Sequence, residues 1–424
     1  MRPLTSTFAA RQLGAWSVIA LGAAVGRFFG PSARGAIESL AALRLGVHAI
    51  ATLGVPGAAT FRVARDPASI GRVASTALGL SLAVGTAAAL AVGAWAWSHP
   101  SAYAPVGLWA VLVFAASVPP ILLTQMEGGV LLGAERIGAW NALTVVNRGL
   151  VFPLIALAWF PPLRVVETIV VGLAAAELAT AATALAFVRR EAPLRVRVDL
   201  PLVRELAGYG GVAWVQGMLT WAVLRSDVLL LGALGGTAEL GQFAAAGIAR
   251  EMVFFLPWIA GMLLFPRVAK ASAAAGSSSP GESALRGPGT RALPKALGPK
   301  GIAVVLGAAV LLFAFAGPFV VGIHGREFAP AAPVVRVLVP SALLMSWGSL
   351  LVQEMLGRGA PALTWISPGA AFVVTVVGNL YAIPRYGALG TAWVALAASA
   401  VLLAFARVGV ARARARDGAS PHVS

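Results

Sequence analysis

Long apolar stretches alternate with short polar or charged segments along almost the whole chain. Cutting at clusters of glycine, proline and charge gives about twelve stretches of roughly the 20 residues that a helix needs to cross a bilayer. They lie near residues 12–30, 36–61, 72–97, 104–125, 138–160, 166–188, 208–234, 240–265, 301–322, 333–355, 362–383 and 388–408. This pattern predicts an all-α polytopic membrane protein with about twelve transmembrane helices.

The composition agrees with lipid as the main solvent of the chain. Of the 424 residues 59% are hydrophobic and 11% are charged, and the mean hydropathy is +0.85. Soluble domains carry about 25% charged residues, so a water-soluble fold could not cover itself with so few. The absence of cysteine excludes disulfides, iron–sulfur clusters, Cys-based zinc sites and thiolate nucleophiles, and the four histidines are too scattered for a metal site. We expect neither a metal nor a cofactor.

The net charge of +16 comes from arginine and lysine residues that gather in alternate connecting segments. The basic segments include Arg62, Arg65 and Arg72; Arg189, Arg190, Arg195, Arg197 and Arg204; and Arg407, Arg412, Arg414 and Arg416. The positive-inside rule then places both termini in the cytoplasm of a cell inner or plasma membrane protein. No nucleic-acid-binding motif is present, so membrane anchoring explains the charge better than a nucleic-acid partner. The first stretch is long enough to span, which favours an uncleaved helix over a signal peptide.

The order of the stretches predicts two lobes of six helices each. The N-terminal lobe would cover residues 1–190, a basic cytoplasmic linker 191–207, and the C-terminal lobe 208–424 with a basic tail. Residues 271–300 are rich in Ala, Ser, Gly and Pro, which is typical of a disordered loop, here a cytoplasmic one.

A short internal match supports a repeat between the lobes. Gly35 and Gly241 stand at the start of the second and eighth stretches with an offset of 206, and the same offset relates Arg44 to Arg250. Halves with an even number of helices would form parallel repeats about an axis along the membrane normal. Chance similarity between small residues is the alternative.

Charged residues inside the apolar stretches are the candidate functional residues, because each costs about 2.5–3.5 kcal/mol in the middle of a membrane. These residues are Glu38, Arg44, Arg148, Glu177, Arg225, Asp227, Arg250, Glu251 and Glu354. Arg44 and Arg250 lie at matched depth, about 13 Å below the outer end of their helices. Two such guanidiniums predict a clamp for a pyrophosphate or another anionic head group. The alternative is that each pairs with Glu38, Glu251 or backbone carbonyls, or extends outward to the interface.

Arg148 and Arg225 are the other candidate cationic groups of a central cavity. Arg225 and Asp227 point to different helix faces, so we expect no direct bond between them. Asp227, Glu177 and Glu251 are the candidates for coupling to a proton or sodium ion, since a buried carboxyl group can carry either. For Asp227 a structural ion pair with Arg148 or Arg250 is an equal alternative.

Two further groups of residues have a functional and a structural interpretation. Trp214 and Trp221 could form a surface for stacking sugars, but this spacing is more typical of helix packing or an interfacial belt. The segment 323–332 carries His324, Arg326 and Glu327, which could serve catalysis or lie in a hydrated turn.

Several short segments together resemble a known transporter family. Arg225–Leu231 and Glu239–Ala246 are similar to the seventh-to-eighth-helix signature of the polysaccharide (oligosaccharide, O-antigen-type) flippases. Similar matches are found at Phe28–Gly35, Phe265–Ala269, Gly325–Ala331 and Asn379–Gly390. The family belongs to the multidrug/oligosaccharidyl-lipid/polysaccharide (MOP) exporter superfamily, which also contains multidrug-and-toxin extruders and lipid II flippases. The resemblance covers the whole chain. The chain departs from the family's pattern in the basic 271–300 segment and at Arg250-Glu251.

The resemblance implies two six-helix lobes around a central cavity that opens alternately to each side. The expected function is flipping of a polyprenyl-pyrophosphate-linked oligosaccharide, a repeat unit of a polysaccharide or lipopolysaccharide such as O-antigen, from the inner to the outer leaflet. Arg44, Arg250, Arg225 and Arg148 would neutralise the pyrophosphate, and a membrane potential or a gradient of H⁺ or Na⁺ would drive transport. Proteins of polysaccharide assembly are conceivable partners.

Two other functions remain open on sequence alone. A multidrug exporter of the same superfamily would need an acidic and aromatic cavity, whereas the interior charges here include four arginines. A membrane-embedded polysaccharide polymerase or ligase would need a large outer loop with catalytic groups, and the outer segments are short. We therefore expect a transporter and not an enzyme.

Overall fold

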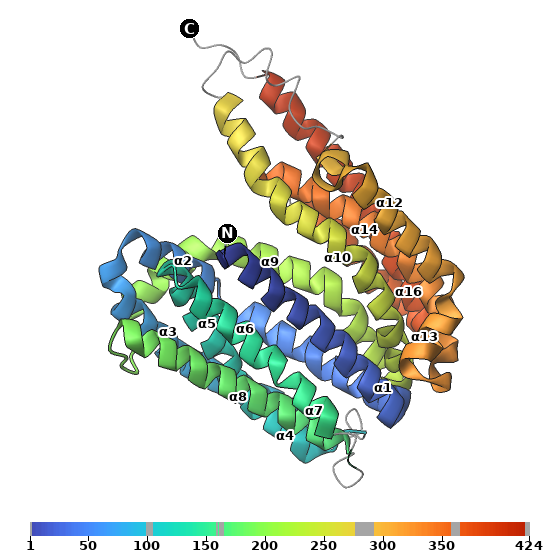
Figure 1. The fold of residues 1–424 in the computed structure, drawn as a ribbon, viewed down its shortest axis with the longest axis horizontal. Coiled ribbons are helices and arrows are strands. Elements are labelled where there is room, and N and C mark those ends of the chain that lie inside the picture. The colour runs from blue at the N-terminus through green and yellow to red at the C-terminus, as the bar shows by residue number, and fades with distance from the viewer. Residues whose placement is uncertain are drawn as a thin grey trace. The chain divides into compact units, whose positions relative to one another are not determined.

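The computed structural model describes residues 2–98, 105–157, 160, 165–275, 292–357 and 365–419, and all regular elements in these ranges are helices (Figure 1). The first part of the chain forms α1 (Arg2–Ala51), α2 (Val55–Arg65), η1 (Pro67–Ser69), α3 (Ile70–Ser98), α4 (Leu108–Ala116), α5 (Val118–Gly133), α6 (Ile137–Gly149), α7 (Val151–Leu157) and α8 (Val166–Glu191). The second part forms α9 (Leu200–Leu234), α10 (Gly236–Ala275), α12 (Ala292–Ala314), α13 (Ala316–His324), η4 (Arg326–Ala331), α14 (Ala332–Gly357) and α16 (Ile366–Ala419).

Two of the long helices each contain one expected span and most of a second. The backbone leaves helical geometry at Gly30 in α1, with φ 77° and ψ −175°, and at Gly387 in α16, with φ 52° and ψ −133°. Glycine adopts such positive φ values without steric cost. Seven helices of the described ranges are long and apolar enough to cross a membrane, or eight if α12 and α13, which meet at 81°, form one broken span. The fold is that of a multi-pass membrane protein, and the total of about twelve crossings stays a prediction.

The expected continuous second span, residues 36–61, is wrong. Helix α1 ends at Ala51, and α2 begins at Val55 after a break in which Leu53 and Gly54 have φ values of 48° and 73°. Trp214 of α9 stabilises this break, because its Nε1 donates hydrogen bonds to the carbonyl oxygens of Ala49 and Ile50 at 2.8 and 3.2 Å. These are carbonyls of the last turn of α1, which lack helical partners.

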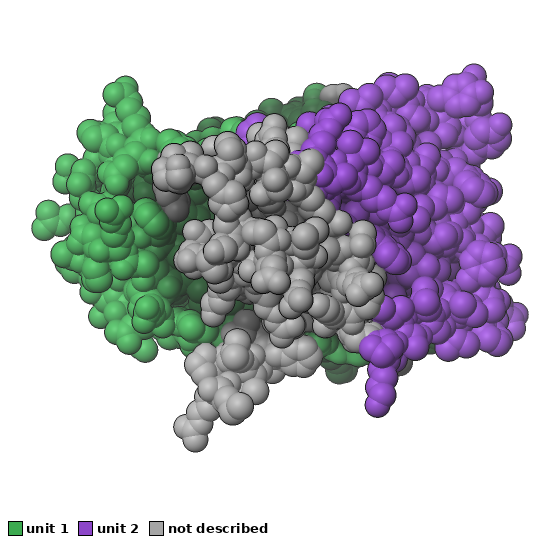
Figure 2. All heavy atoms as spheres, turned by 90° about the horizontal axis from the view of Figure 1, so that it is seen from above, with its two compact units in different colours: residues 1–221, 236–241 green, residues 222–235, 242–424 purple. Residues whose placement is uncertain are grey.

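The chain divides into two compact units, coloured in Figure 2. Unit 1 contains residues 1–221 and 236–241, and unit 2 contains residues 222–235 and 242–424, so the division falls within α9. In unit 1, α5 packs against α2, α3 and α8 around buried Val63, Met126 and Val188. In unit 2, α14 packs along α16. The two six-helix lobes joined by a linker at 191–207 stay a prediction.

Both ends of the segment 271–300, which was predicted to be a disordered loop, are helical. Helix α10 extends to Ala275 and α12 begins at Ala292, while residues 276–291 lie outside the described ranges. The sequence Ala271–Ala275 contains four alanines, the residue with the highest helix propensity, which accounts for the extension of α10.

The first half of α9 packs antiparallel against α1 and α2. Gly54 and Gly210 touch through their backbones, since a Cβ atom on either would lie 2.4 Å from the carbonyl oxygen of the other. Gly46 leaves room for the ring of Trp221, which would lie 2.5 Å from a Cβ atom there. Both tryptophans, Trp214 and Trp221, therefore serve helix packing, which confirms the structural interpretation of these residues.

Glu127 of α5 is the most unusual buried group of unit 1. Its side chain is completely buried, and neither carboxylate oxygen has a hydrogen-bond partner in the described part of the chain. The predicted fourth span ended at residue 125, so the sequence did not mark Glu127 as an interior charge. The glutamate lies between Met126 and Val130, two residues of the main hydrophobic cluster of unit 1.

We expect Glu127→Met to stabilise the protein, because an apolar side chain of similar shape removes a buried polar group without a partner. The gain should be about 1–3 kcal/mol, measured as a rise in the thermal unfolding midpoint of the detergent-purified protein. Glu127→Lys, which adds a charge to the same apolar surroundings, should lower that midpoint. A lower midpoint for the methionine variant would mean that the carboxyl group has a partner or a role that the structure does not show.

Candidate functional site

A cavity of about 450 Å³ lies entirely within unit 1. It is enclosed by α1, α2, α5, α6 and α8, and polar side chains line much of it. The polar and aromatic lining residues are Arg44, His48, Thr60, Thr124, Gln125, Trp140, Thr144, Asn147, Arg148, Glu177 and Thr180. This volume is in the range of small-molecule sites, which are about 300–1,000 Å³.

The charged groups of this cavity do not balance. Arg44 of α1 forms an ion pair with Glu177 of α8. Arg148 of α6 also lines the cavity, and within the described ranges it forms neither a hydrogen bond nor an ion pair. Two guanidinium groups and one carboxylate leave one positive charge that no ion pair of the described residues compensates. Because a buried charge is costly without a partner, the cavity favours an anionic ligand.

Hydrogen-bond donors and a helix start add to the same cavity. His48 Nδ1 and Thr124 Oγ1 are buried there and have no hydrogen-bond partner among the described residues. The break at residues 52–54 lets α2 begin at the cavity wall, where Pro56 and Gly57 of its first turn line the space. The Val55 N–H already donates a hydrogen bond to the carbonyl oxygen of Thr52, and Pro56 has no N–H, so among the first three residues of α2 only Gly57 offers an N–H group, together with the partial positive charge of a helix start. The cavity therefore combines several groups that bind oxyanions.

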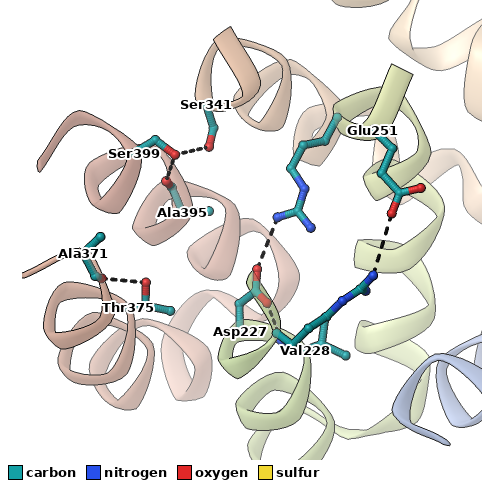
Figure 3. Close-up of polar contacts among 10 residues, drawn as sticks. Asp227, Val228, Glu251, Ser341, Ala371, Thr375, Ala395 and Ser399 are labelled. Atoms are coloured by element: carbon teal, nitrogen blue, oxygen red, sulfur yellow. Dashed lines mark hydrogen bonds and ion pairs between the residues drawn. The ribbon is translucent and has the colours of Figure 1, made fainter. Parts of the chain in front are cut away.

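A second polar cluster lies in unit 2 (Figure 3). Arg250 Nη1 of α10 is 3.3 Å from Asp227 Oδ2 of α9, and Asp227 Oδ1 accepts a hydrogen bond from the Val228 N–H at 2.8 Å. Arg225 Nη2 is 4.0 Å from Glu251 Oε1. Each arginine of this cluster thus has an acidic neighbour.

A small cavity of about 30 Å³ adjoins the Asp227–Arg250 pair. Its lining includes Ser341, Thr375 and Ser399, and Ser341 and Ser399 share a hydrogen bond of 3.0 Å between their hydroxyl oxygens. The volume is sufficient for a water molecule or a small ion. Asp227 itself is almost completely buried, with 3% of its surface exposed.

The structure brings some of the predicted site residues together and separates others. Arg44, Arg148 and Glu177 share the cavity of unit 1, while Arg225, Asp227, Arg250 and Glu251 form the cluster of unit 2. Each member of the proposed Arg44–Arg250 clamp thus lies in its own unit, and the clamp stays a prediction. Arg225 and Asp227 form no direct bond, as predicted. Asp227 pairs with Arg250, which was one of the two alternative partners given for it.

Glu38 and Glu251, which were suggested as alternative partners of the two clamp arginines, pair with other residues. Glu38 pairs with Arg34, one helical turn away, at 3.0 Å, whereas Arg44 pairs with Glu177. Glu251 is the neighbour of Arg225, and Arg250 pairs with Asp227. Helix rotation decides these pairings, and rotation depends on packing that the sequence did not specify.

Sequence reasoning missed the uncharged members of the unit 1 cavity. Asn147 donates a hydrogen bond of 3.3 Å to Thr180, and Trp140, Gln125 and His48 line the space beside it. One signal was present: Trp140, Asn147 and Arg148 follow each other at helical spacing within one apolar stretch.

The fold of long apolar helices is similar to that of solved membrane transporters, among them members of the MOP superfamily. An inward-facing multidrug resistance MATE family transporter matches with a TM-score of 0.70 and 17% identity, over 95% of this chain and 94% of that one. The lipid II flippase MurJ in an inward closed conformation matches with a TM-score of 0.70 and 12% identity, over 98% and 89% of the two chains. An outward-facing MATE transporter gives 0.59 and 19%, over 99% and 95%.

At these identities the matches establish the fold alone. No protein-family model matches the chain, and no curated protein sequence does either.

Proposed function

We propose that the protein is a membrane transporter that moves an anionic lipid-linked saccharide, such as a polyprenyl-pyrophosphate-linked oligosaccharide, from the inner to the outer leaflet by alternating access. The observation that carries the proposal is the 450 Å³ cavity in which Arg44 is held by Glu177 and Arg148 has no hydrogen-bond or ion-pair partner among the residues that the structure describes. The fold, shared with a lipid II flippase and with multidrug transporters, supports a transport function.

The chemistry of the cavity supports an anionic and hydroxylated ligand. Arg148 can bind a phosphate or carboxylate through two parallel hydrogen bonds. Gln125, Asn147 and Thr144 offer donors and acceptors for sugar hydroxyl groups, and Trp140 offers an apolar face. In this proposal Arg148 and Arg44 receive the anionic group directly.

The cluster of unit 2 has a different role in the proposal. Arg250 and Arg225 have acidic neighbours, so they are weaker candidates for direct pyrophosphate binding than Arg148. Asp227 and Glu251, together with Glu177 of unit 1, remain the candidates for coupling to H⁺ or Na⁺. Binding of a cation beside Asp227 would compete with Arg250 for the same carboxylate and so could link the ion to the arrangement of unit 2.

The alternative functions find less support. A multidrug exporter of cations would place its substrate against an excess of positive charge in the unit 1 cavity, which is unfavourable. A polymerase or ligase would need His324 as a reactive group, but its side chain is 1% exposed and packs on the ring of Phe328.

We expect Arg148→Ala to lose most transport activity. A hydrogen bond to a charged group is worth about 1.5–3 kcal/mol, so transport should fall by about 10- to 100-fold. The measurement is the amount of lipid-linked saccharide that accumulates in a strain lacking the gene and carrying the variant. Arg148→Lys should restore part of the function, because it keeps the charge and loses the planar geometry.

The matched control is Arg326→Ala, which removes an exposed arginine of unit 2 and should complement fully. Normal complementation by Arg148→Ala would show that the unit 1 cavity does not bind the transported molecule. Normal surface polysaccharide without the gene, together with raised sensitivity to cationic drugs, would support the multidrug exporter instead.

A further inference from the structure

One end of unit 1 carries many arginines, of which only some have acidic partners. Arg62 lies 3.2 Å from Asp66 and 3.3 Å from Glu205, Arg72 lies 2.7 Å from Asp199, and Arg136 lies 2.8 Å from Glu191. These contacts join the end of α2 to α9, α3 to the segment before α9, and the start of α6 to the end of α8.

The carboxylate of Asp199 accepts two hydrogen bonds. Its Oδ2 accepts the hydrogen bond from Arg72, and its Oδ1 accepts one from the Leu202 N–H at 3.1 Å, which caps the start of α9. The Arg72 guanidinium and this N–H hold the pKa of Asp199 below its usual range. The carboxylate therefore stays charged near neutral pH and compensates Arg72.

Six further arginines at the same end are exposed, and within the described ranges none of them forms an ion pair. These residues, called the arginine surface below, are Arg65, Arg189, Arg190, Arg195, Arg197 and Arg204. The nearby acids Asp66, Glu191, Asp199 and Glu205 all contact the other three arginines. The arginine surface therefore carries an uncompensated positive charge.

The middle of the arginine surface is a fixed segment and not a free loop. The Arg195 N–H donates a hydrogen bond of 3.1 Å to Ser75 Oγ of α3. The carbonyl oxygen of Arg197 approaches Gly79 so closely that a Cβ atom there would lie 2.5 Å away. Both contacts are made by backbone atoms, so the segment is held against α3 while the side chains of Arg195 and Arg197 remain exposed.

Apolar side chains are exposed between these arginines. Val196 is 70% exposed, Leu200 is 64% exposed and Val198 is 39% exposed. In water this arrangement would be unfavourable, whereas at a bilayer surface the aliphatic groups reach the acyl chains while guanidinium groups remain at the phosphates.

The length of α3 places this end of unit 1 at the depth of lipid head groups. Exposed tryptophans Trp95 and Trp97 mark the other end of α3, as expected for an interfacial aromatic belt. Ser75, which accepts the hydrogen bond from the Arg195 N–H, and Trp95 are 20 residues apart, which corresponds to about 30 Å of helix. A hydrocarbon core is about 30 Å thick, so Trp95 and the arginine surface reach opposite interfaces.

We propose that the arginine surface is a docking site for anionic phospholipids, whose phosphates contact Arg195, Arg197 and their neighbours while Val196 and Leu200 insert among the acyl chains. The site is separate from the unit 1 cavity and does not depend on the identity of the transported molecule. It selects lipid by the charge of the head group, and its occupancy fixes the segment 192–199 and the start of α9 at the membrane surface.

The test compares lipid binding to the full-length protein and to Arg195→Gln/Arg197→Gln. The purified protein is titrated with dioleoylphosphatidylglycerol or dioleoylphosphatidylcholine, and bound lipids are counted by native mass spectrometry. Each arginine near an anionic surface contributes about fivefold in affinity, so the double variant should bind phosphatidylglycerol about 25-fold more weakly. The preference of the wild type for phosphatidylglycerol should shrink as salt rises from 0.1 to 0.5 M.

The matched control is Arg326→Gln/Arg336→Gln, which removes the same charge from exposed arginines of unit 2 and should keep the wild-type preference. An equal unfolding midpoint of both double variants in phosphatidylcholine would show that the fold is intact. Val196→Ser should weaken binding of both lipids while the preference for phosphatidylglycerol remains. Equal affinity of the wild type for the two lipids, or an undiminished preference in Arg195→Gln/Arg197→Gln, would overturn the proposal and leave an acidic protein partner as the explanation of the surface.

Discussion

Gly241→Ala is expected to destabilise the protein strongly, because α1 and α10 touch through their backbones at this glycine. A Cβ atom on Gly241 would lie 1.9 Å from the carbonyl oxygen of Pro31, and one on Gly35 would lie 1.8 Å from the carbonyl oxygen of Thr237. Neither contact can be relieved by a side-chain rotation, so the helices would have to separate. We expect a loss of about 3 kcal/mol or more, seen as a fall of roughly 6–12 °C in the unfolding midpoint.

Gly247→Ala is the matched control for this prediction. Gly247 lies on the same helix, and a Cβ atom there would meet no other atom within 4 Å. Alanine favours the helix over glycine, so this variant should be neutral or slightly stabilising. Gly35→Ala should behave like Gly241→Ala. Equal stability of the Gly241 and Gly247 variants would mean that the helices do not approach each other as described.

The glycine contact also bears on the internal repeat. Gly35 and Gly241, which the sequence relates by an offset of 206, contact each other's helix in a reciprocal manner within unit 1. Reciprocal contacts are what a two-fold relation between repeats produces. The ion pairs do not follow the same relation, since Arg44 pairs with α8 and Arg250 with α9. The backbone contact therefore fits the predicted repeat, whereas the ion pairs do not.

The helical character of the chain could be predicted from hydropathy, whereas the breaks within helices could not. The break at residues 52–54 depends on Gly210 and Trp214, which lie more than 150 residues further along the chain. No local pattern reveals such a contact. Proline gave a partial signal at α5 and α7, where the helices that follow the breaks contain Pro119 and Pro153 near their starts.

The sequence predicted which residues belong to the candidate site better than it predicted how they are arranged. The cost of a charge in lipid identified Arg44, Arg148 and Glu177, which share one cavity. The pairing of these groups depends on how each helix is rotated about its axis, and a difference of one residue changes the direction of a side chain by about 100°. Sequence therefore predicted that interior charges meet but not which ones.

Arg250→Ala is expected to destabilise unit 2, because it leaves Asp227 buried without its partner. Asp227 is 3% exposed, and the guanidinium of Arg250 lies 3.3 Å from its Oδ2. Removing one member of a buried ion pair costs about 3–5 kcal/mol, and the unfolding midpoint should fall by about 2–4 °C for each kcal/mol. Asp227→Ala should have a similar effect, because Arg250 would then be the unpaired charge.

The double variant Asp227→Leu/Arg250→Met separates structural stability from ion coupling. Well-packed apolar residues can replace a buried ion pair with little loss of stability, so the unfolding midpoint should return close to that of the wild type. If Asp227 couples transport to H⁺ or Na⁺, this stable double variant should still fail to complement a strain lacking the gene. A double variant as unstable as either single variant would show that the two residues do not act as a pair. A stable double variant with full transport would assign Asp227 a purely structural role.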